Sequence, residues 1–81
     1  MRVKVFVTPR KGILDPQGRA VEAALANLGF TGVAELHVGR FIVLALEAPS
    51  KAAAEETVRK MCEQLLANPL IEEYRFEVEP G

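Results

Sequence analysis

The side chains of this chain that could do chemistry are few and scattered. His37 is the single histidine and Cys62 is the single cysteine. A catalytic histidine needs an orienting partner and a nucleophile or substrate proton within reach, and His37 has no cysteine or serine in such a context. Cys62 follows Met61 on the apolar side of a helical pattern, where a free cysteine usually belongs to the core. We therefore expect neither residue to be catalytic.

Two pairs of adjacent glutamates are the other candidates for acid–base chemistry, Glu55-Glu56 and Glu72-Glu73. Neighbouring side chains point to opposite faces of a strand and diverge by about 100° on a helix, so neither pair converges on one substrate. One cysteine and one histidine also supply too few ligands for a metal site. The sequence predicts no catalytic residue, no metal site and no cofactor bound by this chain.

The most specific string is the loop of residues 11–18. Asp15 can cap a helix and Pro16 suits its first position. This helix start would attract an anion, but the Asp15 carboxylate already occupies it and repels anions. Gly18 falls in the first helical turn, where glycine costs up to about 1 kcal/mol relative to alanine, so we expect it to permit close approach of another backbone. We interpret the loop as partner-facing through Lys11, Gly12, Asp15, Pro16, Gln17 and Gly18.

Length and composition indicate one small globular domain over residues 1–81, with 49% hydrophobic and 26% charged residues. A core of this size is modest, and oligomerisation is a common remedy. The net charge of -1 argues against nucleic-acid binding, which usually requires a basic excess. No apolar run reaches the ~20 residues of a membrane span. The first residues alternate and lack the apolar region of a signal peptide, so we expect a cytoplasmic protein.

Periodicity and turn residues place the secondary structure that must position these side chains. Alternation predicts strands, a 3.6-residue apolar period predicts helices, and the two central strands form a hairpin about Gly39-Arg40. The resulting order, βαββαβ, predicts a ferredoxin-like α+β fold with a four-stranded antiparallel sheet and two helices on one face. The predicted elements are strand 2–8, helix 16–28, strands 33–38 and 41–47, helix 51–67 and strand 71–78, with Ser50 as the N-cap of the second helix.

The predicted hairpin has apolar residues on both faces. A two-residue loop pairs Val38 with Phe41, and we expect that face to meet the helices. Ile42, Leu44 and Leu46 fall on the reverse face, which Phe6 joins from the first strand. Exposed apolar surface of this kind usually marks an interface. We therefore expect these three residues to contribute to self-association of a symmetric oligomer.

Two blocks of the sequence resemble the PurS family, the small subunit of phosphoribosylformylglycinamidine synthase. The first block is Lys11-Gly12-Ile13-Leu14-Asp15-Pro16-Gln17-Gly18, and the second runs from Met61 to Glu72. The resemblance extends over the whole chain and includes Gly39-Arg40. In the hairpin the chain departs from the family pattern, with His37 where arginine is common, Arg40 where lysine is common and Val43 where glutamate is common.

The resemblance implies a function that the residues alone do not. The synthase complex converts formylglycinamide ribonucleotide, glutamine and ATP to formylglycinamidine ribonucleotide in purine biosynthesis, using magnesium. A PurQ-like glutaminase subunit releases ammonia, and a PurL-like synthetase subunit accepts it. PurS-like chains are dimers or tetramers that bridge these two subunits and support ammonia transfer. The resemblance thus implies a subunit of an ATP-dependent C–N ligase that has no catalytic site of its own.

The sequence leaves two other functional classes open. A stand-alone ferredoxin-like regulatory domain would bind an amino acid or nucleotide in its loops or dimer interface. An RNA-binding domain would need exposed aromatic residues on the central strands with a basic surround. The predicted alternation places Phe41, Tyr74 and Phe76 on the helix-covered face, which disfavours RNA binding.

Overall fold

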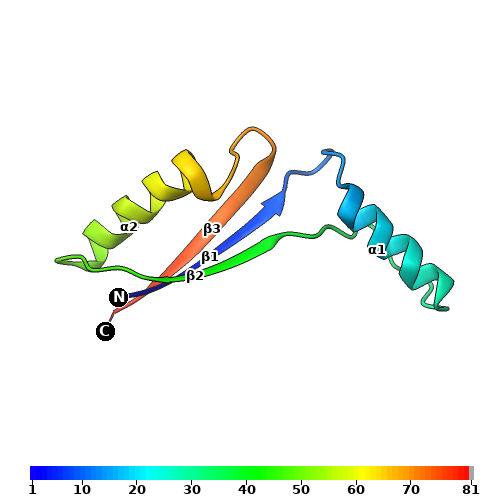
Figure 1. The fold of residues 1–81 in the computed structure, drawn as a ribbon, viewed down its shortest axis with the longest axis horizontal. Coiled ribbons are helices and arrows are strands. Elements are labelled where there is room, and N and C mark those ends of the chain that lie inside the picture. Colours follow the sequence, from blue (N-terminus) through cyan, green and yellow to red (C-terminus); the bar gives the residue numbers. More distant parts are fainter. Residues whose placement is uncertain (81) are drawn as a thin grey trace.

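The computed structural model describes residues 1–80, which form an α+β fold with two helices and a three-stranded antiparallel sheet (Figure 1). The strand order is β2-β1-β3, so β1 is central and both of its neighbours are edge strands. In chain order the elements are β1 (Arg2–Pro9), α1 (Pro16–Asn27), β2 (Arg40–Ala45), α2 (Lys51–Met61), the π-helical turn η1 (Cys62–Leu66) and β3 (Glu72–Glu79).

The hydrophobic core lies between one face of the sheet and α2. Alternate residues of β1 point to this face, which confirms the period-two prediction for that strand. The apolar side of α2 and the following turn complete the core, since Val58 and Cys62 are fully buried. The buried members are Val3, Val5, Val7, Ala54, Val58, Cys62, Ala67 and Val78.

Both helices begin at the residues predicted to cap them. The side chain of Asp15 accepts a hydrogen bond from the Gly18 N–H (3.0 Å), and the Ser50 hydroxyl accepts one from the Ala53 N–H (3.1 Å). Each bond satisfies a backbone donor that has no partner within the helix. Helix α1, together with α2 and its continuation η1, confirms the two predicted helices.

The predicted hairpin about Gly39-Arg40 is wrong for the single chain, whose described residues form three strands instead of four. A two-residue hairpin would need the Val38 N–H for its first cross-strand bond. Here that N–H donates to Asp15 Oδ2 (2.9 Å). Glu35 has a φ of 56°, a left-handed conformation that interrupts an extended strand. Residues 33–38 are therefore irregular, and β2 begins only at Arg40.

The predicted assignment of faces in β2 is also reversed. Ile42 and Leu44 pair with Val5 and Val3 of β1, so they share the face that α2 covers. Phe41 and Val43 lie on the opposite face, and Phe41 is 58% exposed. The predicted faces of β2 follow from the predicted hairpin. Residues 33–38 do not pair with β2, so this basis for the prediction is absent.

Helix α1 does not cover the sheet that its own chain forms. It projects from one end of the sheet, connected by the loop after β1 and by the irregular segment before β2 (Figure 1). The radius of gyration is 16.0 Å, against about 12 Å for a compact domain of this length. The accessible surface is 5833 Å², which exceeds the value of about 4,800 Å² for a compact protein of this mass. We call α1 and residues 28–38 the arm.

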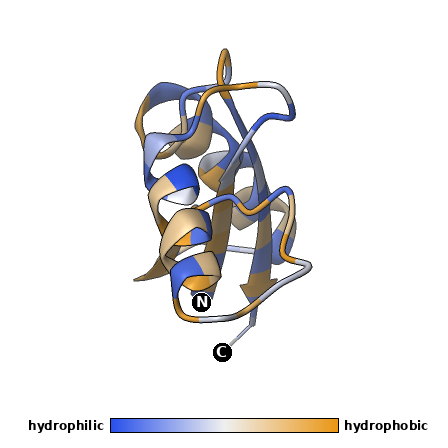
Figure 2. Ribbon diagram, turned by 90° about the vertical axis from the view of Figure 1, so that its right-hand side faces the viewer, coloured by the Kyte–Doolittle hydropathy of each residue, from blue (hydrophilic) through white to orange (hydrophobic). Residues whose placement is uncertain are grey.

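The arm carries apolar side chains that the rest of the described chain leaves largely uncovered. Leu28 is 73% exposed and Phe30 is 59% exposed, and Val21 and Val33 are also exposed. Figure 2 views the molecule from the side on which the arm lies. It shows hydrophobic residues along α1 and the segment after it. None of the helices described in residues 1–80 has the length and apolarity needed to cross a membrane.

Candidate protein-interaction site

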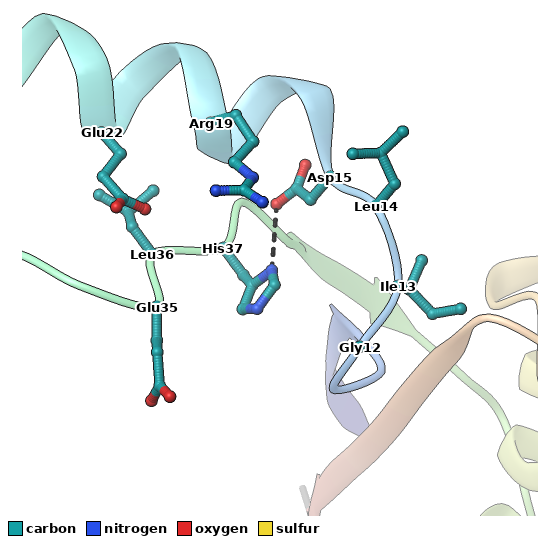
Figure 3. Close-up of a pocket in the computed structure, with 9 residues that line it drawn as sticks. All are labelled: Gly12, Ile13, Leu14, Asp15, Arg19, Glu22, Glu35, Leu36 and His37. Carbon is teal, nitrogen blue, oxygen red and sulfur yellow. Dashed lines mark ion pairs between the residues drawn. The ribbon is translucent and has the colours of Figure 1, made fainter.

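The Asp15 carboxylate joins the two parts of the arm. Its Oδ1 accepts a hydrogen bond from the Gly18 N–H, and its Oδ2 accepts one from the Val38 N–H (2.9 Å). Nδ1 of His37 lies 3.4 Å from the same Oδ2, and the Asp15 side chain is only 10% exposed. The helix start and the segment before β2 are therefore held together as one unit (Figure 3).

These hydrogen bonds set the ionisation of Asp15. The Gly18 and Val38 amides bind the charged carboxylate and hold the pKa of Asp15 below its usual value of 3.8, with His37 adding to the effect. Partial burial acts in the opposite direction but is outweighed. Asp15 thus remains charged at neutral pH and accepts the hydrogen bonds that join the start of α1 to residue 38.

Gly18 is buried because the backbone of residue 36 lies against it. A Cβ atom at this position would lie 2.6 Å from the Leu36 carbonyl oxygen and would also meet the Asp15 carboxylate. The sequence predicted close approach of another backbone at Gly18, and the structure shows that this backbone belongs to the same chain. Asp15 and Gly18 consequently shape the arm from within.

The other residues of the predicted partner-facing loop point to solvent. Lys11, Gly12, Pro16 and Gln17 are all exposed. Gly12 has a φ of 87°, a left-handed conformation that favours glycine. The structure thus divides the six predicted residues into two that build the arm and four that are accessible to a partner.

A hollow of about 390 Å³ lies between this loop, the start of α1 and residues 35–37 (Figure 3). Asp15, Arg19 and His37 converge in it, whereas the Glu35 carboxylate points away. His37 is thus an imidazole with an orienting carboxylate, but the residues that line this hollow include no hydroxyl or thiol nucleophile. Among residues 1–80, no cluster of three or more metal-ligating side chains occurs either.

Cys62 lies in the core, as its position on the apolar side of the helix predicts. Burial raises the pKa of its thiol, and the neighbouring Glu63 carboxylate raises it further. A thiol with a raised pKa is a poor nucleophile at neutral pH.

An ion pair that the sequence analysis missed joins the two edge strands. Arg40 binds Glu72 through both terminal nitrogens, with Nη1–Oε2 at 2.9 Å and Nη2–Oε1 at 3.0 Å. Nη2 also donates to the Leu66 carbonyl (2.8 Å), and the Asn68 N–H donates to Glu72 Oε1 (2.7 Å). Arg40 and the Asn68 amide together hold the pKa of Glu72 below its usual value. The two partners are 32 positions apart in the sequence, so no local sequence signal indicates this contact.

The sheet face opposite α2 is open, and aromatic residues occupy its centre. The rings of Phe6 and Phe41 stack with centroids 5.0 Å apart, and the Arg75 guanidinium lies 4.0 Å from the Phe6 centroid. Phe41 is therefore not on the covered face, contrary to the expectation that disfavoured RNA binding. Carboxylates share this face, since Lys4 pairs with Glu79 (2.9 Å). The surround is mixed in charge, not basic as RNA binding would require.

Ile42, Leu44 and Leu46, the residues predicted to mediate self-association, lie beside the core on the α2 face. They are partly buried and pack against its margin. Because α2 packs over β3, the side of this face formed by β2 is only half covered. A second layer there would complete the burial of all three side chains.

An uncovered arm, an exposed loop and an open sheet face define a small α+β subunit that works by contact with other protein chains. Residues 2–80 match the family model described as PurS: phosphoribosylformylglycinamidine (FGAM) synthase. The chain belongs to this family.

Individual PurS proteins are similar to this chain in sequence and structure over almost its whole length. The PurS subunit of phosphoribosylformylglycinamidine synthase from Synechocystis sp. is 47% identical over 75 residues, which cover 93% of this chain and 75% of that protein. The structure of Bacillus subtilis PurS matches with a TM-score of 0.86 at 42% identity and covers 98% of both chains. A chain in the structure of PurLQS from Thermotoga maritima matches with a TM-score of 0.84 at 37% identity, over 94% of this chain and 93% of that one.

Replacing Gly18 should loosen the arm. In Gly18→Ala the new methyl group meets the Leu36 carbonyl, so residues 36–38 must move away from α1. We expect the Val38 amide to exchange with solvent at least about tenfold faster, as measured by NMR hydrogen exchange. Gln17→Ala, at the exposed neighbouring position, is the control and should leave the rate unchanged. Equal protection in both variants would contradict this description of the arm.

The contribution of Asp15 should depend on pH. Since its pKa is lower in the folded chain than in the unfolded chain, Asp15 stabilises the fold above pH ~3.8 and loses this effect as pH falls through its lowered value. Urea unfolding of Asp15→Asn should therefore show a deficit against the wild type at pH 7 that shrinks toward pH 3. A deficit that stays constant between these pH values would refute a role for the charged carboxylate.

Proposed function

We propose that this chain is the non-catalytic small subunit of an FGAM synthase complex, bridging a PurQ-like glutaminase and a PurL-like synthetase. The observation that carries the proposal is the match, over 94% of the chain, to a chain in the PurLQS structure of Thermotoga maritima. The complex would convert formylglycinamide ribonucleotide and glutamine to formylglycinamidine ribonucleotide and glutamate in the cytoplasm. The synthetase subunit would use ATP and magnesium, and this chain would support ammonia transfer between the active sites.

The contact surface toward these subunits would be the loop before α1 together with the first turn of that helix. Lys11, Gly12, Pro16 and Gln17 offer exposed side chains and backbone. Asp15 and Gly18 would act indirectly, by fixing the backbone on which those residues are displayed. A preorganised loop loses less conformational entropy when it binds than a mobile one.

Self-association would cover the arm. The surface of the single chain exceeds that of a compact protein by about 1,000 Å², which is comparable to the ~800 Å² that each partner buries in a standard interface. Two copies related by a two-fold axis could exchange arms, so that α1 of each copy packs on the sheet of the other. This exchange would place Leu28 and its apolar neighbours over Ile42, Leu44 and Leu46.

The exchange would also complete the fold that the sequence predicts. Among residues 1–80, the outer edge of β2 has no pairing partner, and exposed edges tend to recruit another strand. Part of residues 33–38 from the second copy would supply a fourth strand there. Each sheet would then have four strands and two helices on one face, a ferredoxin-like arrangement assembled from two chains. A tetramer would require a further contact, for which the open face around Phe6 and Phe41 is available.

Reconstitution tests the functional proposal. PurL and PurQ from the same source, assayed for glutamine-dependent formation of formylglycinamidine ribonucleotide, should be activated at least about tenfold by this chain. Ammonium in place of glutamine is the control, because the synthetase alone can then be supplied with nitrogen and should respond much less. Equal glutamine-dependent rates with and without the chain would exclude the proposed role. A large thermal stabilisation of the isolated chain by an amino acid or nucleotide would instead favour a regulatory domain.

Leu28→Glu tests the exchange of arms. The side chain is 73% exposed in the single chain, so the variant should fold, but a charge would be buried in the proposed dimer. We expect its dissociation constant to rise at least about tenfold, as measured by light scattering over a dilution series. Leu70→Glu, at a leucine outside the arm that is 86% exposed, should dimerise like the wild type. Unchanged association of Leu28→Glu would contradict the exchange.

A further inference from the structure

The sequence Gly39-Arg40 is compatible with a hairpin turn as well as with the straight course that the structure shows. Gly-Arg suits a two-residue hairpin turn in which glycine takes a positive φ. That turn would fold the arm back onto the sheet of its own chain. In the structure Gly39 has no positive φ, and the chain runs straight into β2. Gly39 lies so close to the Val7 carbonyl that no Cβ atom would fit.

Arg40 makes its contacts in the straight chain. It is then the first residue of β2, in register with Val7 of the central strand. From this position its guanidinium spans to Glu72 and to the Leu66 carbonyl, at distances of 2.8–3.0 Å. In the hairpin, Arg40 would be a turn residue outside this register, and its side chain would be carried away from β3.

We propose that the Arg40–Glu72 pair is a latch that keeps the chain straight at Gly39. It thereby favours the form that exchanges its arm with a second copy over a closed monomer. A contact present in one state and absent from the other shifts the equilibrium toward the first. The bidentate geometry, the additional bond to Leu66 and the low exposure of the Glu72 side chain (15%) make this contact stronger than an ordinary surface pair. The inference rests on the self-association proposed above.

Variants of Arg40 test the latch. Arg40→Gln removes the positive charge and the two-nitrogen contact with Glu72. Arg40→Lys keeps the charge but cannot bind Glu72 through two nitrogens. Arg59→Gln is the matched control, because it breaks an exposed pair with Glu56 within α2 (3.2 Å). The dissociation constant is measured by light scattering on dilution. The radius of gyration of the diluted protein is measured by small-angle X-ray scattering.

The latch predicts a graded result. Arg40→Gln should raise the dissociation constant about tenfold to a hundredfold, with Arg40→Lys between it and the wild type and Arg59→Gln unchanged. The diluted Arg40→Gln monomer should have a radius of gyration near 12 Å, below the 16.0 Å of the straight chain. A merely destabilised variant would lose association without this compaction. Arg40 variants that dimerise as tightly as the wild type, or dissociate to an elongated monomer, overturn the latch.

A second variant decides the matter if Arg40→Gln fails to fold. Glu72→Gln removes the same ion pair from its other side and leaves Gly39-Arg40 unchanged. It should give a compact monomer, and an elongated dimer would overturn the proposal. The oligomeric state of the wild type shows whether a negative result refutes the latch or the proposed self-association. A wild type that is monomeric at all concentrations refutes self-association, whereas a wild-type dimer with unaffected variants refutes the latch alone.

Discussion

The Asp15 carboxylate is the contact on which the arm depends. It caps α1 with one oxygen and binds the Val38 N–H with the other, so the helix and the segment before β2 move together. The same bond removes the donor that a hairpin at Gly39-Arg40 would use, and this loss leaves β2 with an open edge. One side chain therefore determines both the rigidity of the arm and the incompleteness of the sheet.

This incompleteness gives a physical reason for the proposed self-association. A chain of 81 residues buries little surface by itself, and this one gives up part of its possible core by extending α1 away from the sheet. In the proposed exchange of arms, the uncovered apolar residues of the arm would cover the half-covered edge of the sheet in the other copy. The exposed residues around the start of α1 would then remain available on each copy for the larger subunits of the synthase.

Local sequence signals predicted the elements well but not their assembly. The alternation of Val3, Val5 and Val7 and the caps at Asp15 and Ser50 gave strands and helices close to those observed, because each depends on neighbours within a few residues. The hairpin failed because the competing bond to Val38 comes from a residue 23 positions earlier. The faces of β2 were reversed for the same reason. The Arg40–Glu72 pair also links residues that are distant in the sequence, and the spacing of apolar residues does not indicate such a contact.

The central claim is that α1 of one copy packs on the sheet of another. Mixing isotope-labelled with unlabelled protein, refolding the mixture and recording isotope-filtered NOE spectra tests this claim directly, since only contacts between different copies are then detected. The account predicts cross-peaks between Leu28 methyl groups of one copy and Ile42 or Leu44 methyl groups of the other. The absence of these cross-peaks from the filtered spectra of a dimeric sample would contradict it.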